Sequence, residues 1–235
     1  MFGFAGIAVF GGALFAALYR PAPSAFSAGS HGHALTRGSL SAVRHPVMWG
    51  LILLGLINMG GFSVTFFVPY AVESVFSLNA KASAAIISSS YLFSIFLNLG
   101  VGWLCDRYSR WNIMIVLAAL LIPASFAVLS HDLLVFRIGI ALVVSLGHAA
   151  TNQIYAICGA VLSRDEIGTG MGMVGLGSGI FGYLEPQMLG YLRDTTGGFT
   201  AGWLFVAFAA VISLADLLLL RARSSRSRAG EPVAV

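Results

Sequence analysis

Charged residues are scarce in this chain. They make up 9% of its 235 residues, whereas 58% are hydrophobic. An average soluble domain carries roughly 25% charged residues. A soluble protein of this length could bury one large core, but it could not cover its surface with so few charges. The composition therefore predicts an integral membrane protein whose surface is largely covered by lipid.

Cysteine is also scarce, and several motifs that carry chemistry are absent. Cys105 and Cys158 lie far apart, form no CxxC pair and belong to no cluster of metal ligands, so neither a disulfide framework nor a zinc site is expected. The sequence has no phosphate-binding loop with its lysine, no HExxH motif and no Ser/His/Asp arrangement on one side of a membrane. We expect no enzymatic activity, no cofactor and no bound metal.

The excess of basic residues, 13 Lys and Arg against 9 Asp and Glu, does not indicate nucleic-acid binding. These residues are spread over short loops and one tail, whereas nucleic-acid-binding proteins concentrate them on one face.

Seven apolar runs are long enough to cross a bilayer as helices, which takes about 20 residues each. They lie at 2–19, 47–71, 82–104, 111–130, 133–160, 168–191 and 200–220. No basic segment precedes the first run, and Arg20 follows it, so it is predicted to be a retained span rather than a signal peptide. Ser163 is a candidate N-cap for the sixth span.

Basic residues are distributed unequally between the two sides that seven spans define. One side carries ten of them and the other three: Arg20, Arg37, Arg44, Arg107, Arg110, Arg164, Arg221, Arg223, Arg226 and Arg228 against Lys81, Arg137 and Arg193. The positive-inside rule places the first set in the cytoplasm. We expect a plasma (inner) membrane protein with its N-terminus outside, its C-terminus inside, and a basic tail that fixes topology or touches anionic lipid.

The turn between the third and fourth predicted spans carries a distinctive set of residues, Gly102-Trp-Leu-Cys-Asp106-Arg107-Tyr-Ser-Arg110-Trp111. Glycine permits a close approach of helix and turn, the carboxylate can cap a helix, and the arginines can make and break charge-assisted contacts. The alternative is an ordinary charged turn that obeys the positive-inside rule.

This segment resembles the loop signature of the major facilitator superfamily, G-x-L-A-D-R-x-G-R-K. Ser109 stands where that pattern has glycine, and Trp111 replaces a basic residue. Residues 182–197 also resemble the penultimate helix of that family and the loop after it. The resemblance implies a secondary transporter that moves a small solute by alternating access, with Gly102, Asp106, Arg107 and Arg110 as its conformational gating loop.

The resemblance also implies a domain organisation. Residues 1–20 look like the last helix of the family's first half, 21–46 like its cytoplasmic basic loop, and 47–220 like its C-terminal six-helix bundle, followed by the basic tail at 221–235. Five helices of the first bundle have no counterpart. The chain is therefore expected to be a truncated or partial transporter, with a missing N-terminal half or another membrane subunit as partner. The alternative is a non-transporting membrane module that associates with another membrane protein; a seven-span receptor fits less well because the loops are short.

Polar residues inside the spans are the candidates for solute contact, because such groups are costly in lipid. His148 and Asn152 share one face of the fifth span with Ser145 and Tyr155. On the third span one face carries Tyr91, Ser94 and Asn98, and on the second Asn58 lies near the middle. By resemblance, spans two and five line the cavity, so Asn58, His148 and Asn152, with Tyr91 as a wall, are predicted to contact the solute. The alternative for each is hydrogen bonding between helices.

Two further features concern the fifth and sixth spans. His148 can change charge near neutral pH and is a candidate carrier of a coupling H⁺. Glu185, just before Pro186, is another, although it could instead reach the outer interface. Five glycines at spacings of four and three in the sixth span predict a smooth face for close helix packing: Gly168, Gly172, Gly175, Gly179 and Gly182.

Overall fold

The chain divides into two units, residues 1–36 and 37–235. The computed structural model describes residues 44–163 and 166–228, and within them it describes no side chains for 62–65 or 224–228. The predicted span at 2–19 and all but the last three residues of the predicted basic loop at 21–46 lie outside the described residues.

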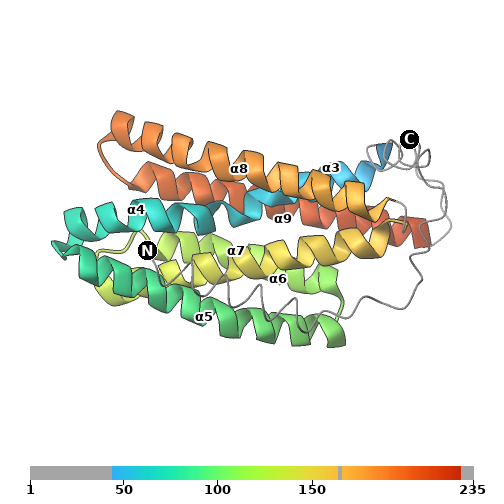
Figure 1. The fold of residues 1–235 in the computed structure, drawn as a ribbon, viewed down its shortest axis with the longest axis horizontal. Helices are drawn as coiled ribbons and strands as arrows, with labels where there is room; N and C mark the ends of the chain where they lie inside the picture. The colour runs from blue at the N-terminus through green and yellow to red at the C-terminus, as the bar shows by residue number, and fades with distance from the viewer. Residues whose placement is uncertain (1–43, 164–165, 229–235) are drawn as a thin grey trace, which may run out of the picture. The chain divides into compact units, whose positions relative to one another are not determined.

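The described residues form helices and no strand, in a single bundle. Figure 1 shows the long helices running side by side. In chain order the elements are α3 (Pro46–Leu53), η1 (Leu54–Asn58), α4 (Met59–Phe76), α5 (Ala80–Arg107), α6 (Arg110–Ala127), α7 (Leu133–Val161), α8 (Ile167–Thr196) and α9 (Thr200–Arg228). The first three form one interrupted span, and six helical segments in all are long and apolar enough to cross a membrane. The prediction of an all-α fold is confirmed, and so are the last six of the seven predicted spans.

Local chemistry sets several helix ends. The side chain of Asn79 accepts the amide N–H of Ala82 at the start of α5, and Asp132 accepts the N–H groups of Leu134 and Val135 at the start of α7. The predicted cap at Ser163 is wrong in detail, because the N-cap of α8 is Glu166. Ser163 instead donates both its N–H and its hydroxyl to the Glu166 carboxylate.

The core lies where α7 packs against its neighbours. Helix α7 contacts α4, α5 and α6, while α6 packs on α9. Its buried side chains include Ile140, Val143, Val144 and Ile154. Helices α5 and α8 lie on opposite flanks of this core (Figure 1) and are the two least buried spans. One side of α5 and one side of α8 are therefore not covered by other described helices.

Candidate functional site

The first span is interrupted inside the bundle. Between α3 and α4 the chain tightens into the 3₁₀ segment η1, and Asn58 at its end has φ −94° and ψ 4°, which is outside helical geometry. The segment packs on α8, since a Cβ placed on Gly55 would lie 2.9 Å from the ring of Phe181. A 3₁₀ stretch within a long helix is typical of a hinge. Sequence periodicity did not reveal this break, because apolar residues surround it on both sides.

Asn58 sits beside this break, between two glycines. Its side chain is 5% exposed, and its Oδ1 atom is buried without a hydrogen-bond partner. A Cβ on Gly147 of α7 would lie 2.9 Å from that oxygen, and a Cβ on Gly61 would lie 2.6 Å from it. The absence of a side chain at both positions is therefore what leaves room for Asn58 to point at α7. Burying an acceptor in this way normally costs about 1–3 kcal/mol.

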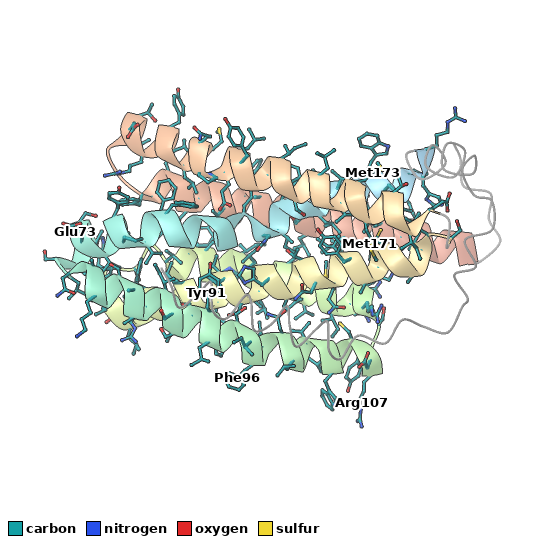
Figure 2. All side chains as sticks on the ribbon, viewed as in Figure 1. Glu73, Tyr91, Phe96, Arg107, Met171 and Met173 are labelled. Carbon is teal, nitrogen blue, oxygen red and sulfur yellow. The ribbon has the colours of Figure 1, made fainter. Side chains whose placement is uncertain are left out.

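A polar groove lies between α5 and α7. It is open along one side and has a volume of about 580 Å³. Its lining consists of Tyr91, Ser94, Ile95, Asn98, Leu99, His148, Thr151 and Asn152. Figure 2 shows Tyr91 on the side of α5 that faces α7, whereas Phe96 on the same helix points away from the bundle. The tyrosine ring stacks on the imidazole of His148, with centroids 5.7 Å apart and an angle of 25° between the planes.

A row of hydrogen bonds crosses this groove. The Asn152 amide donates to the Asn98 side-chain oxygen over 2.8 Å. The Asn98 amide donates to the hydroxyl of Ser94 over 3.2 Å and to its carbonyl over 2.7 Å. The same hydroxyl lies 3.4 Å from Nδ1 of His148. Side chains from the two helices are thus joined into one polar network.

Ser94 links this network to His148. The Ser94 hydroxyl accepts from Asn98 and lies against Nδ1 of the imidazole, and the direction of that second contact depends on the tautomer of the ring. A Cβ on Gly61 would lie 3.5 Å from Nε2 of His148 and 2.6 Å from Oδ1 of Asn58. The second ring nitrogen and the unpartnered acceptor therefore border the same small space, although no hydrogen bond joins them.

The residues predicted to contact solute lie in two different places. Tyr91, His148 and Asn152 lie together in the groove. Asn58 is not part of the lining but lies directly behind His148. Asn98, Ser94 and Thr151 line the groove although they were not named as contacts; the shared face of 91, 94 and 98 was the signal that could have identified them.

Two other polar residues of α7 lie elsewhere. Ser145, although on the predicted face, is fully buried, and its hydroxyl has no hydrogen-bond partner. The Tyr155 hydroxyl instead lies near α8, at 3.6 Å from a Cβ placed on Gly175. Helical periodicity alone therefore overstated how much of α7 faces the groove.

Glu185 lies on the buried face of α8. Its exposed fraction is 0%, and it shares its face with Gly177, which packs on Ile52, and with Leu189, which packs on Gly202. The helix continues to Thr196, eleven residues further on, or about 16 Å at the helical rise. This burial favours a position inside the bundle over the alternative in which Glu185 reaches the outer interface.

The 102–111 segment lies at one end of the bundle. Helix α5 runs to Arg107, so only Tyr108 and Ser109 separate it from α6. Asp106 is exposed and does not cap α6, which begins after Ser109 without a side-chain capping bond. Gly102 faces open space. The close approach expected at the glycine and the cap expected from the carboxylate are therefore both absent from the described residues.

The two arginines of this segment make weak contacts within the chain. The Arg107 guanidinium lies 5.0 Å from the centre of the Trp103 ring and points outward in Figure 2. Arg110 donates a long hydrogen bond of 3.5 Å to the carbonyl of Ala156 in α7. Neither arginine forms an ion pair within the described part of the chain, so both remain available to a surface outside it.

The uncovered sides of α5 and α8 carry large apolar side chains. Helix α5 exposes Leu92, Ile95, Phe96, Leu99 and Trp103, and α8 exposes Leu176, Ile180, Tyr183, Leu184 and Tyr191. Three glycines of the predicted α8 stripe, Gly168, Gly172 and Gly179, face open space, so any close packing at these positions involves a surface outside the described residues. The glycines of α8 that contact neighbours closely are Gly170 and Gly177.

Comparison with known proteins identifies relatives of this chain. The Major Facilitator Superfamily model matches residues 1–186. A protein of Agrobacterium vitis named "Putative tartrate transporter" is 30% identical over 200 residues, which cover 80% of this chain and 43% of that protein. The "Probable nitrate transporter NarT" of Staphylococcus epidermidis is 23% identical over 184 residues, or 77% and 47% of the two chains. The chain spans about half the length of these relatives.

The fold is also found in solved structures. The crystal structure of the E. coli fucose:proton symporter FucP superposes with a TM-score of 0.69 at 17% sequence identity, over 88% of this chain and 51% of that one. A structure of FucP in the outward conformation gives a TM-score of 0.67 over 92% and 52%. These relatives are transporters, which agrees with the expectation that the chain is not an enzyme. The chain is a multi-pass membrane protein and belongs to the major facilitator superfamily.

Proposed function

We propose that this chain is part of a secondary transporter that moves a small solute across the membrane by alternating access. The observation that carries the proposal is the hydrogen-bonded polar groove between α5 and α7. Polar side chains facing lipid are costly and serve as a default indication of a functional site. A groove of this kind is consistent with a water-filled pathway, and Tyr91, His148 and Asn152, with Asn58 behind them, form part of its wall.

The lining favours a neutral or weakly ionised solute. Among its residues are amides, hydroxyls, one imidazole and one phenol ring, and no arginine, lysine or carboxylate. Such groups suit a solute rich in hydroxyls, which donates and accepts hydrogen bonds. The names of the relatives include two anions, tartrate and nitrate, and the structural neighbour is named for fucose. On the chemistry of this groove, a sugar-like solute fits better than either anion.

Two groups are suited to carry a coupling proton. Protonation of His148 would make both ring nitrogens donors, so that Ser94 would have to accept a hydrogen bond from Nδ1. Such a change would reach Asn98 and Asn152 through the same network. Glu185, buried in α8, is the second candidate. The structural neighbour is named as a proton symporter.

The wider organisation is part of the same proposal. Residues 47–220 would form the C-terminal bundle, with 1–20, 21–46 and 221–235 as the preceding helix, the basic loop and the tail, the N-terminus outside and the C-terminus in the cytoplasm of a plasma membrane. The gating role of Gly102, Asp106, Arg107 and Arg110 would depend on a complementary half. The open space at Gly102 and the outward position of Arg107 are consistent with contacts made to that half.

A second candidate function is that of a non-transporting module that associates with another membrane protein. It is favoured by the uncovered faces of α5 and α8, which combine exposed apolar side chains with glycines facing open space. Small residues on a membrane helix permit close helix packing. Purified chain that is strictly monomeric and stable would count against this function.

Binding of defined solutes tests the proposal. Purified chain in lipid nanodiscs is mixed with radiolabelled L-fucose, L-tartrate or nitrate, and bound label is measured at equilibrium. We expect saturable binding of fucose and at least tenfold weaker binding in Asn152→Ala and His148→Ala, because both variants interrupt the groove network. Asn112→Ala, an exposed asparagine at the start of α6, is the matched control and should bind as the wild type does.

Two results would contradict the proposal. One is the absence of saturable binding of all three solutes, both by the chain alone and by the chain purified together with its membrane partners. The other is unchanged binding in Asn152→Ala and His148→Ala. An antibody against the C-terminal tail, applied to native membranes, measures separately whether the native polypeptide is longer than 235 residues.

A further inference from the structure

A second hollow lies at the end of the bundle opposite the 102–111 segment, where Figure 2 labels Glu73. It has a volume of about 330 Å³ and is formed by the ends of α4, α6 and α8 and the starts of α7 and α9. It shares no lining residue with the groove between α5 and α7. Nothing in the proposed solute pathway requires it.

One wall of this hollow is aromatic and well packed. The rings of Phe76 and Phe136 meet with centroids 5.0 Å apart and planes inclined at 56°. Phe136 is 2% exposed and Trp203 is 3% exposed, so both are fixed by the core behind them. Val128 and Leu129 complete an apolar floor. The wall is thus rigid and suited to the apolar body of a ligand.

The opposite side of the hollow carries an arginine without an anionic partner. The Arg193 guanidinium lies 5.0 Å from the centre of the Tyr70 ring and 5.2 Å from that of Phe199. Cation–π contacts of this kind orient a guanidinium without neutralising it. Within the described residues Arg193 forms no ion pair, and no carboxylate lines the hollow.

The neighbouring acidic residues are engaged or directed elsewhere. Asp132 caps α7 through its Oδ1 atom, and Asp194 and Glu73 are exposed outside the lining. Thr200 lines the hollow and is exposed, so its hydroxyl is accessible to a ligand there. Thr200 also opens α9, where the helix dipole adds partial positive charge. Charge and hydrogen-bond donors therefore meet on one side of an apolar hollow.

We propose that this hollow binds a small amphipathic monocarboxylate. Its carboxylate pairs with the Arg193 guanidinium and accepts a hydrogen bond from the Thr200 hydroxyl, while its apolar body lies against Phe76 and Leu129, the partly exposed side chains of the apolar wall. Arginine offers a carboxylate two parallel N–H donors, which gives both affinity and orientation. A single arginine matches a single carboxylate, and the aromatic wall selects against small hydrated anions such as nitrate.

The probe for this site is 4-fluorophenylacetate, and the readout is its ¹⁹F NMR saturation transfer from the chain in phosphatidylcholine nanodiscs. We expect saturable binding to the wild type. The neutral analogue 4-fluorophenylacetamide should bind at least tenfold more weakly, because it retains the ring and loses the charge. This comparison uses the wild-type protein alone and so does not depend on how any variant folds.

Variants then assign the binding to Arg193. Arg193→Gln should weaken binding of the acid at least tenfold and leave the amide unchanged, whereas Arg193→Lys should retain part of the affinity. The matched control is Arg137→Gln, an exposed arginine near the same end of the bundle that does not line the hollow; it should bind as the wild type does. Equal binding of acid and amide, wild-type binding by Arg193→Gln, or no saturable binding would overturn the proposal.

A lipid comparison distinguishes the two natural sources of such an anion. If the carboxylate of a membrane fatty acid occupies the hollow, adding oleate to the phosphatidylcholine will weaken probe binding in the wild type. If the occupant is a water-soluble organic acid, the probe affinity will be the same with and without oleate. Either result retains the recognition by Arg193 and identifies where its partner comes from.

Discussion

Replacement of Asn58 by leucine is expected to stabilise the chain. Oδ1 of Asn58 is buried and has no hydrogen-bond partner, and its surroundings are the two glycines Gly61 and Gly147. Leucine has a similar shape and no polar atom. Asn58→Leu therefore removes an unsatisfied acceptor without leaving a large cavity.

The magnitude follows from two opposing effects. Relief of an unsatisfied buried acceptor contributes about 1–3 kcal/mol. A substitution of roughly conserved volume in a packed site costs up to about 1.5 kcal/mol. The net expectation is a gain of about 1 kcal/mol, which corresponds to a rise in Tm of about 2–4 °C for a chain of this size.

The assay is thermal unfolding of purified protein in one detergent. Asn98→Leu is the matched control, because Asn98 donates two hydrogen bonds and accepts one. Its replacement should lower the Tm, since Ser94 and Asn152 lose partners. A lower Tm in Asn58→Leu than in the wild type would refute the reasoning, because it would mean that Oδ1 has a stabilising partner such as water.

Two further predictions concern other positions in the bundle. Gly147→Ala should destabilise the chain by about 1–3 kcal/mol, since its new methyl group would lie 2.9 Å from Oδ1 of Asn58; Gly179→Ala, which faces open space, should leave the Tm unchanged or raise it, and thermal unfolding compares the two. Glu185→Gln should retain solute binding but abolish uptake driven by a pH gradient in proteoliposomes, because the amide occupies the same space and cannot ionise; uptake equal to that of the wild type would exclude Glu185 as the proton carrier.

Features that depend on short stretches of sequence were predictable. The length and hydropathy of each span are local properties, because each needs only the residues within a bilayer thickness. The caps at Asn79 and Asp132 are equally local but were not predicted. The connections between the described spans were predicted to within a few residues of their observed positions. The exceptions are the ends of α4, α8 and α9, which lie at Phe76, Thr196 and Arg228 where the sequence predicted ends at 71, 191 and 220.

The groove was predictable in part. The shared face of Tyr91, Ser94 and Asn98 followed from helical spacing, as did that of His148 and Asn152. Their meeting across two helices did not, because the pairing of Asn98 with Asn152 depends on how α5 and α7 are aligned along each other. Ser145 and Glu185 illustrate the same limit, since only packing against neighbouring helices decided that both are buried.

The sequence by itself determined that this chain lies in a membrane, which segments of the described residues span it, and which family signature it carries, because hydropathy and local motifs depend only on residues that are close together in the sequence. The tertiary structure alone decided the break at η1, the unpartnered oxygen of Asn58, the hydrogen-bonded row from Asn152 to His148 and the hollow around Arg193. Each of these depends on atoms brought together from helices far apart in the sequence, and the packing that brings them together is a property of the whole bundle.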